Sequence, residues 1–436
     1  MKSVSEIHYI YLILNIYIYK MTKKILFIIV LLSISFGFSQ VETEINPSYN
    51  IKTITLTQNG QNAIPIFRVT DNFMLEFDDL FGNEANYYYT FVHCNYDWTP
   101  SDLSRNEYIT GFDDIRIQDH FNSFNTLQIY THYKVGFPNK NTQFKVSGNY
   151  MLKILNEERE VVFSRKFMLY EPKVTVPIQV RRTRNMTVFN TKHNLDFAIK
   201  STTLTFQNPL QNVKIMILQN GQYNRPITNI APQYTMGNDL IYKYDAETQF
   251  WAGNEFLGFD TKEVRSPGNN VSFVNTQGGL YNTHLFANAA RRNVPYTYFP
   301  DINGNYSVRN LNSTNNAIEA DYSWVFFTLS APSYYGKSDI YVNGLFDNYA
   351  LSPDNKMDYN KDKAIYEKAI MIKQGFVNYQ FVIADKSGKI DYENAIDGNF
   401  FQTENNYSIL VYYRENGQRF DKIIGKGDAT SVDITN

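Results

Sequence analysis

The chain has 436 residues, of which 41 are lysine or arginine and 43 are aspartate or glutamate, giving a formal net charge of -2. This length favours about two to four domains, and the neutral balance, without a long basic run, excludes the face that nucleic-acid binding requires. Hydrophobic residues make up 43% of the chain and charged residues 19%, which argues against disorder over most of its length. The 34 tyrosines and 32 phenylalanines suit pleated, half-buried surfaces, so the composition favours an all-β fold.

The N-terminal region carries the features of an export signal. A basic stretch at Met21–Lys24 is followed by apolar residues from Ile25 to Ile34 and by small residues before Gln40. This order is typical of a secretory signal peptide, and its apolar part is shorter than the roughly 20 residues that span a bilayer. We therefore expect a signal peptide at residues 21–39 and a mature protein that begins near Gln40.

A second apolar stretch precedes this signal. A cleavable signal has no use for it, so we interpret residues 1–20 as a spurious upstream extension and Met21 as the true start. The alternative is a transmembrane hairpin of the two stretches, which their shortness and the lysines between them disfavour. No cysteine follows the signal to carry a lipid anchor, and no later stretch is apolar for long enough to span. We expect a soluble protein outside the cytoplasm.

Alternating apolar and polar residues, the pattern of half-buried strands, recur from about residue 50 to the C-terminus. The clearest runs are 53–56, 87–93, 127–133, 150–155, 195–199, 213–218, 240–244, 324–329, 340–342, 379–383 and 408–413. Tight-turn pairs lie between many of them: Asn59-Gly60, Asn220-Gly221, Asn303-Gly304, Asn343-Gly344 and Asn416-Gly417. Short strands with frequent turns predict tandem immunoglobulin-like β-sandwich domains.

Two breaks divide the mature chain. Tyr170-Glu171-Pro172 ends one strand-rich block, and residues 310–316, rich in Asn, Ser and Thr, have the composition of a linker. We therefore expect β domains at 40–172, 173–316 and 317–436. The third block, with SDIYVNGLFDNY and MIKQGFVNYQFVIAD, resembles the early-set immunoglobulin-like modules that accompany glycan-processing enzymes. That resemblance implies a sandwich fold and raises glycan binding as an alternative function.

One polar cluster has the residue types that catalysis or metal binding uses. In HCNYDWTPSDL, the side chains of His93, Cys94 and Asp97 could act as metal ligands or as a nucleophile with its base. Alternation along a strand places His93 and Cys94 on opposite faces, however, where they do not converge on one ion. We therefore expect no catalytic residue, no cofactor and no metal site, and a buried, inert Cys94 thiol.

Three aromatic clusters stand out. Tyr87-Tyr88-Tyr89 lies in a strand and is expected to be mostly core. Residues 295–300 and Tyr334-Tyr335 lie in turn-rich contexts, where they pack over the end of a sandwich or form an exposed contact surface for protein or glycan.

The segment FVHCNYDWTPSDLSRNEYITGFDDIRIQDHFNSFNTLQIYTHYKVGFPN, followed by SGNYMLKI and SRKFML, resembles the first domain of type IX secretion system plug proteins. Further pieces of the same family follow, including FWAGNEFLGFD, YFPDINGNY, DYSWVFFTL and TENNYSILVYYR, while Asp397-Gly398-Asn399 departs from the Glu-Gly pair expected there. The matching positions are fold signatures or contact residues: His93, Cys94, Asp97, Trp98, Ser101, Tyr108, Gly111, Asn125, Thr126, His132, Tyr133, Asn254, Glu255 and Asp260.

The resemblance implies a function without chemistry. A very wide outer-membrane barrel leaves an aqueous lumen that side chains cannot fill, so an export pore needs a stopper. The resemblance therefore implies a soluble periplasmic plug that closes the inner end of a SprA-like translocon barrel, with no nucleic acid and no small-molecule substrate as partners. The alternative is a secreted glycan-binding β-sandwich protein.

Overall fold

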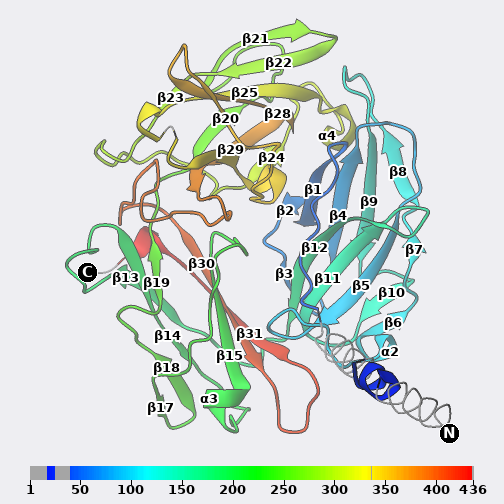
Figure 1. Cartoon of the computed structure of the whole chain (residues 1–436), viewed down its shortest axis with the longest axis vertical. Coiled ribbons are helices and arrows are strands. Elements are labelled where there is room, and N and C mark those ends of the chain that lie inside the picture. Colours follow the sequence, from blue (N-terminus) through cyan, green and yellow to red (C-terminus); the bar gives the residue numbers. More distant parts are fainter. Residues whose placement is uncertain (1–16, 25–39, 335, 435–436) are drawn as a thin grey trace, which may run out of the picture.

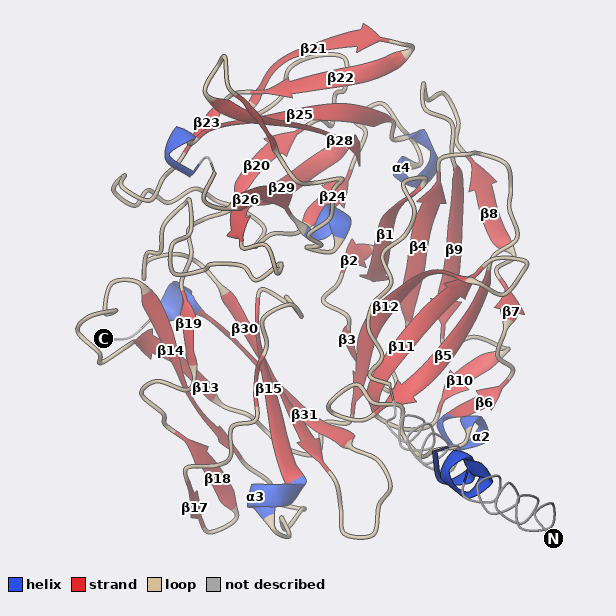
Figure 2. Ribbon diagram, in the orientation of Figure 1, coloured by secondary structure: helices blue, strands red, loops and turns tan. Residues whose placement is uncertain are grey.

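The structure of the protein, a computed structural model, describes residues 17–24, 40–334 and 336–434. Of the expected upstream extension and signal peptide, only 17–24 lie in these ranges, where they are helical; the rest lies outside the described residues. Among the described residues, no helix is both long enough and apolar enough to cross a membrane. Strands dominate the fold (Figure 2), so the all-β prediction is confirmed.

The first domain is a sandwich of two five-stranded sheets. One sheet has the order β2-β1-β4-β9-β8 and the other β3-β12-β11-β5-β7, and β10 and β6 form a small separate pair. Inward-facing rings such as Phe77, Phe91 and Phe167 fill the space between the sheets, which explains the aromatic excess of the sequence. The elements are β1 (Ile51–Gln58), β2 (Gln61–Asn62), β3 (Ile66–Arg68), β4 (Phe73–Asp79), β5 (Tyr88–Cys94), α2 (Arg105–Tyr108), β6 (Ile109–Gly111), β7 (Ile115–Arg116), β8 (Asp119–Asn122), β9 (Thr131–Phe137), β10 (Thr142–Phe144), β11 (Gly148–Leu155) and β12 (Val161–Tyr170).

The second domain combines two distant parts of the chain. Its elements are β13 (Ile178–Arg182), β14 (Lys192–Ile199), α3 (Pro209–Asn212), β15 (Val213–Gln219), β16 (Ile227–Thr228), β17 (Tyr234–Met236), β18 (Asp239–Tyr242), β19 (Gln249–Trp251), β30 (Asn406–Tyr413), β31 (Lys422–Thr430) and a 3-10 turn at Ser431–Asp433. One sheet has the order β13-β14-β18-β17, with β19 beside β14, and the other β16-β15-β30-β31. The C-terminal β30 pairs with β15 along its whole length, from Val213 opposite Tyr413 to Gln219 opposite Tyr407.

The third domain lies between the two parts of the second in sequence. One sheet has the order β20-β29-β24, with β26 also on β29, and the other β21-β22-β25-β28-β27, with β23 also on β25. The elements are β20 (Leu257–Asp260), β21 (Val271–Gln277), β22 (Leu280–Leu285), β23 (Asn288–Ala289), β24 (Tyr306–Val308), α4 (Asn316–Glu319), β25 (Tyr322–Ser330), β26 (Asp339–Asn343), β27 (Asp358–Asn360), β28 (Ile365–Lys373), β29 (Gly375–Ala384) and 3-10 turns at Pro332–Tyr334 and Leu345–Asp347.

The sheets divide the chain differently from the expected boundary at residue 316. Strands on both sides of that residue share one core, which runs from Phe259 to Ile396, and the C-terminal strands belong to the second domain. The stretch 310–316 is an ordered loop within domain 3 and not a linker between domains. Its ends are hydrogen-bonded to each other, since the Asn310 backbone amide donates to Asn316 Oδ1 (2.8 Å). Asn and Ser side chains bond to nearby backbone in ordered turns as readily as they populate linkers, and composition alone does not separate the two.

The three domains meet around one junction, with domain 1 to the right, domain 3 above and domain 2 at the lower left in Figure 1. The segments that enter and leave domain 3 lie side by side, since the Phe400 amide donates to the Gly253 carbonyl (2.8 Å). Domain 3 is therefore an insertion in domain 2 that also packs against domain 1.

Candidate functional site

A buried charged cluster joins domain 1 to domain 3. Asp78, on β4, is fully buried. Its Oδ2 accepts hydrogen bonds from Lys373 Nζ and from the Tyr322 hydroxyl, each 2.6 Å away. Its Oδ1 lies 2.7 Å from His132 Nδ1, on the neighbouring β9. Because Tyr322 begins β25 and Lys373 ends the adjacent β28, two strands of domain 3 converge on one carboxylate of domain 1.

The charges of this cluster balance one another. Burial alone raises the pKa of Asp78, but the Lys373 ammonium and the His132 imidazole outweigh it and hold that pKa below its ordinary value. Burial lowers the pKa of His132, but hydrogen bonds to Asp78 and Glu76 outweigh it and raise that pKa. The cluster thus sets the Asp78 carboxylate between the His132 imidazole and the Lys373 amine. Burial lowers the pKa of Lys373, although Asp78 opposes that shift. These contacts join domain 1 to domain 3.

A second set of contacts reinforces the same interface. The Asp321 carboxylate accepts the backbone amides of Leu127 (2.6 Å) and Gln128 (3.1 Å), and the Tyr130 hydroxyl donates to the Ala320 carbonyl (2.8 Å). These bonds replace sheet pairing, so the predicted strand at 127–133 begins only at Thr131.

The signature residues Asn125 and Thr126 lie in the loop before these contacts. Asn125 has a positive φ of 58°, and the Thr126 hydroxyl donates to the Gln128 carbonyl (2.8 Å). Both residues shape the loop that docks on domain 3.

Cys94 and Trp98 lie at the interface between domain 1 and domain 2. With Met168 they pack against Met216 and Tyr412 of domain 2 in a buried apolar cluster. Burial raises the pKa of the Cys94 thiol to about 12, which keeps it protonated and unreactive.

Polar bonds cross the same interface. The Tyr412 hydroxyl donates to Asn149 Oδ1 (2.8 Å), and the Tyr96 amide donates to Asp421 Oδ2 (3.0 Å). Asp97, exposed beside them, accepts the Thr99 amide (3.1 Å) and shapes the turn.

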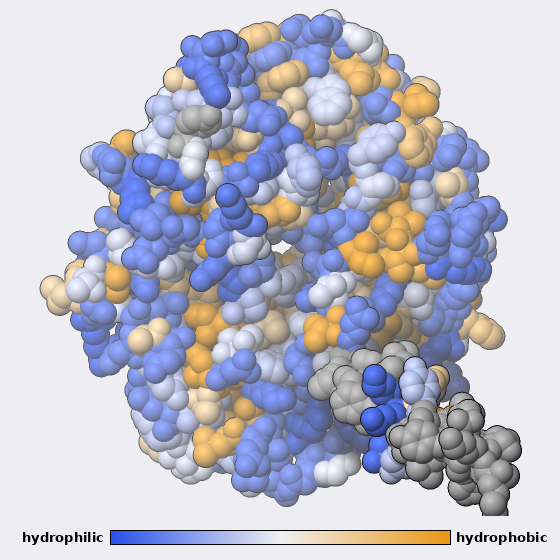
Figure 3. Space-filling model, in the orientation of Figure 1, coloured by the Kyte–Doolittle hydropathy of each residue, from blue (hydrophilic) through white to orange (hydrophobic). Residues whose placement is uncertain are grey.

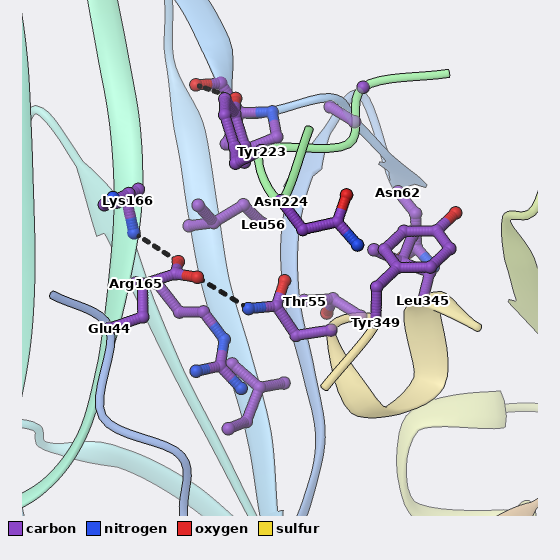
Figure 4. A pocket seen from close by; sticks show the side chains of 15 residues that line it. Glu44, Thr55, Leu56, Asn62, Arg165, Lys166, Tyr223, Asn224, Leu345 and Tyr349 are labelled. Atoms are coloured by element: carbon purple, nitrogen blue, oxygen red, sulfur yellow. Dashed lines mark hydrogen bonds between the residues drawn. The ribbon is translucent and has the colours of Figure 1, made fainter. Parts of the chain in front are cut away.

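A cavity of about 180 Å³ lies where the three domains meet (Figure 4). Its lining residues come from domain 1 (Glu44, Leu56, Asn62, Arg165 and Lys166), domain 2 (Tyr223 and Asn224) and domain 3 (Leu345 and Tyr349). Glu44 bridges two domains, since its carboxylate accepts the Lys166 amide (2.7 Å) and Asn348 Nδ2 (2.8 Å). The cavity has both apolar and polar walls, which fits a packing gap between rigid bodies.

His93 and Ser101 form the one contact among the signature residues that resembles a catalytic pair. His93 Nδ1 lies 2.8 Å from Ser101 Oγ, and His93 Nε2 lies 3.3 Å from the Ser147 carbonyl. The imidazole is buried, and burial lowers its pKa to about 4. Both ring nitrogens make hydrogen bonds. Neither His93 nor Ser101 lines any of the three cavities that lie beside the domain interfaces of the described residues. The pair therefore holds the end of β5 in place.

The other signature residues of domain 1 satisfy backbone groups or close turns. The Tyr108 hydroxyl donates to the Phe91 carbonyl (3.1 Å), and the Tyr133 hydroxyl donates to the Ala85 carbonyl (2.8 Å). Gly111 has a φ of 99°, and a Cβ there would lie 2.1 Å from the Asn141 carbonyl oxygen. Only glycine fits this close approach.

Two of the three signature residues of domain 3, Asn254 and Glu255, lie near the crossing point to domain 2, and Asp260 lies at the far end of β20. Asn254 Nδ2 donates to the Asp397 carbonyl (2.8 Å), and the buried Glu255 accepts hydrogen bonds from Tyr296 and the Glu404 amide. Asp260 forms an ion pair with Lys262 (2.8 Å). The signature residues therefore do not converge on one site, and His132 alone joins the charged cluster.

Sequence reasoning missed three members of that cluster: Asp78, Tyr322 and Lys373. Tyr322 lies in DYSWVFFTL, which carried a family resemblance but no site assignment. No sequence signal pairs Asp78 with Lys373, whose positions differ by 295 residues.

Among the residues that the structure describes, no group of three or more histidine, cysteine, aspartate or glutamate side chains is arranged to hold a metal ion. The face shown in Figure 3 is mostly hydrophilic, with hydrophobic residues in several separate clusters. Exposed aromatic residues include Phe273 on β21, and Tyr298 and Phe299 of the 295–300 segment.

The fold and these contacts define a multi-domain β-sandwich protein whose recognisable residues serve packing and hydrogen bonding. Residues 51–171 match the family model described as the first domain of the type 9 secretion system plug protein. The chain belongs to the type IX secretion system plug family. No enzymatic family is indicated by the comparisons.

A solved structure resembles nearly the whole chain. It is a protein of Parabacteroides merdae, described as hypothetical, with 31% sequence identity and a TM-score of 0.85. The similarity covers 90% of this chain and 100% of the other. A search of curated proteins finds no match.

Proposed function

We propose that this protein is the periplasmic plug of the type IX secretion translocon and that it sterically occludes the periplasmic end of the large outer-membrane barrel. The observation that carries the proposal is the match of the first domain to the plug family over residues 51–171. Membership of this family supports a role with the secretion machinery of the cell envelope. The barrel as direct partner and the periplasm as location are parts of the proposal.

The way the domains are joined supports occlusion by shape. Domains with small polar interfaces move relative to one another by default. Here a buried apolar cluster joins domains 1 and 2, and the Asp78 cluster joins domains 1 and 3. Domains that are held rigidly in this way keep their relative positions when force acts on them, and a protein that occludes a pore by its shape requires this.

A plug must also leave the barrel when cargo arrives. A reversible contact is large in area yet polar enough for the free protein to remain soluble. The mostly hydrophilic face in Figure 3 is compatible with that requirement.

The test uses the tagged full-length protein in a cell that contains the secretion system. We expect capture from detergent-solubilised outer membranes to recover the translocon barrel, and we expect deletion of the gene to admit a membrane-impermeant dye. Wild-type protein supplied in trans should restore the barrier. Unchanged dye entry together with no recovery of the barrel would reject the plug proposal.

The glycan-binding alternative predicts a different result. Binding assays on a panel of soluble and insoluble glycans should give no saturable affinity if the protein acts as a plug. A saturable affinity that survives purification would favour the alternative.

A further inference from the structure

Strand β21 is an open edge of the larger sheet of domain 3. The sheet order places it at one end, paired with β22 alone, and Figure 1 shows it as the outermost strand, far from the domain junction. From Phe273 to Gln277 its register with β22 is regular, and within the described part of the chain no further backbone hydrogen bond reaches these residues. Their outward N–H and C=O groups therefore stand unpaired at the spacing of a strand.

This edge lacks the usual protection. Exposed edge strands of soluble proteins are commonly blocked by lysine, by proline, by shortness or by a bulge. The sequences of β21, VSFVNTQ, and of β22, LYNTHL, contain no charged residue and no proline. The register shift lies at the start of the strand, between Val271 and Phe273, and leaves the rest of the edge regular.

A row of stacked rings crosses the sheet and stops at the same edge. The rings of Phe326 on β25 and His284 on β22 stack with centroids 4.3 Å apart, and His284 stacks on Phe273 at 4.1 Å. All three are cross-strand partners in register. Phe273 stacks on no further ring among the described residues, and its side chain is 48% exposed. Since neighbouring strands lie about 4.8 Å apart, one more strand would set a side chain over Phe273.

We infer that β21 is a docking edge for an extended, uncharged segment of the translocon, which adds to the sheet as a further strand and sets an aromatic or aliphatic side chain against Phe273. Unpaired backbone groups at strand spacing are satisfied by another strand, which is why the occupant is a polypeptide in extended form. The segment is uncharged where it faces the edge, because β21 and β22 offer no charge to pair with.

The same sheet face already binds protein inside the molecule. Tyr322 and Lys373, which lie on the face that carries Phe326, hold domain 1 through Asp78. Trp324 lies on that face between Tyr322 and Phe326 and is 39% exposed. It connects the part of the face that contacts domain 1 with the part that leads to Phe273. The docking edge thus continues an existing protein interface. This inference rests on the proposed function for the identity of the partner.

Hydrogen exchange tests the inference directly. The full-length protein is compared alone and in complex with the detergent-solubilised translocon barrel. Outward amides between Phe273 and Gln277 exchange readily in the free protein, and strand addition should slow them by at least about tenfold. The Asn275→Lys variant, which places a charge in the middle of the edge, should weaken binding of the barrel by about tenfold or more.

A matched control uses another exposed edge strand. Thr235 lies on β17, at the end of a sheet of domain 2, so Thr235→Lys adds the same charge to an edge that the inference does not use. This variant should bind as the wild type does, and both variants should show wild-type thermal unfolding.

The outcomes separate the inference from the plug proposal. A complex that forms without protection of residues 273–277, or that tolerates Asn275→Lys, overturns the docking edge and leaves the plug proposal standing. If these amides become protected when the isolated protein dimerises, the edge binds a second copy of the chain. That result also overturns the docking edge for the translocon. Binding of a soluble glycan to the stacked rings of Phe326, His284 and Phe273, without protection of the β21 amides, also overturns the docking edge. No complex at all overturns the docking edge, and together with unchanged dye entry in the deletion strain it also rejects the plug proposal.

Discussion

Asp78 lies at the centre of the buried charged contact between domains 1 and 3. It is fully buried, and its two oxygens accept bonds from Lys373 and Tyr322 of domain 3 and contact His132 of its own domain. Removing the charge leaves the Lys373 ammonium buried without a counter-charge.

Asp78→Asn should therefore lower the free energy of unfolding by about 3–5 kcal/mol, measured by urea denaturation. The same substitution at Asp119, exposed on β8, should change it by less than about 0.5 kcal/mol. The double variant Asp78→Asn with Lys373→Met should recover part of the loss, because it removes both charges. Equal stabilities of the Asp78 and Asp119 variants would contradict the assigned role.

Two buried histidines should make the protein sensitive to acid. Burial lowers the pKa of His93 and of His193 to about 4, whereas an unfolded chain binds these protons near pH 6.5. Between these values the unfolded state carries more protons, so the free energy of unfolding falls as the pH falls, by up to about 3 kcal/mol per histidine. The raised pKa of His132 acts oppositely, since its contribution is present at low pH and lost as the pH rises through that value.

The His193→Gln variant tests this dependence. Its stability, from urea titrations between pH 7 and pH 4.5, should fall less steeply with acid than that of the wild type. Parallel curves would show that His193 does not contribute.

Cys94 offers a probe of the interface between domains 1 and 2. Burial raises its pKa to about 12, so iodoacetamide at pH 8 should leave the native protein unmodified and should alkylate it fully in denaturant. A cysteine introduced by Ser272→Cys, on an exposed part of β21, should react within minutes under native conditions. Rapid native alkylation of Cys94 would mean that domains 1 and 2 separate.

At the scale of elements, local patterns predicted strands well and their assembly less well. The alternation at 213–218 and 408–413 gave both strands, β15 and β30, because a half-buried strand has a period of two whatever it pairs with. Asn59-Gly60, Asn220-Gly221 and Asn303-Gly304 have positive φ angles at both residues, as the turn chemistry predicted. Asn343-Gly344 does not, since Gly344 is extended with a φ of −171° and starts a 3-10 turn.

The pairing of strands that lie far apart in the chain could not be predicted from the sequence. Alternation does not state which strands are neighbours, so the return of β30 to β15 and the insertion of domain 3 could not be derived from it. The same holds for the charged cluster, because Asp78 resembles any carboxylate at the end of a strand until Lys373 is placed beside it. The signature residues were visible through resemblance, while their individual roles depend on the contacts that the fold creates.

At the scale of the whole molecule, the insertion sets where the chain can be shortened. The entry and exit of domain 3 are hydrogen-bonded to each other at Gly253 and Phe400. A chain in which residues 254–399 are replaced by a short glycine linker should therefore retain folded domains 1 and 2, with a two-domain mass by light scattering and native β circular dichroism.

The fragment 40–316 provides the contrast. It ends at the boundary expected from composition but lacks β25 and the strands after it, so β15 loses its neighbour β30 and the core of domain 3 is cut. This fragment should aggregate, because it exposes long unpaired edges. A soluble, folded 40–316 fragment would contradict the insertion topology.

The split of domain 2 also sets the order of events during biosynthesis. The ribosome releases Gln219 long before Tyr407, its partner 188 residues later. Until that later segment emerges, β15 offers an apolar, unsatisfied edge to every passing chain. The edge of β15 that faces β30 therefore stays open until the last strands of the chain are available, and pairing with β30 is the step that closes it.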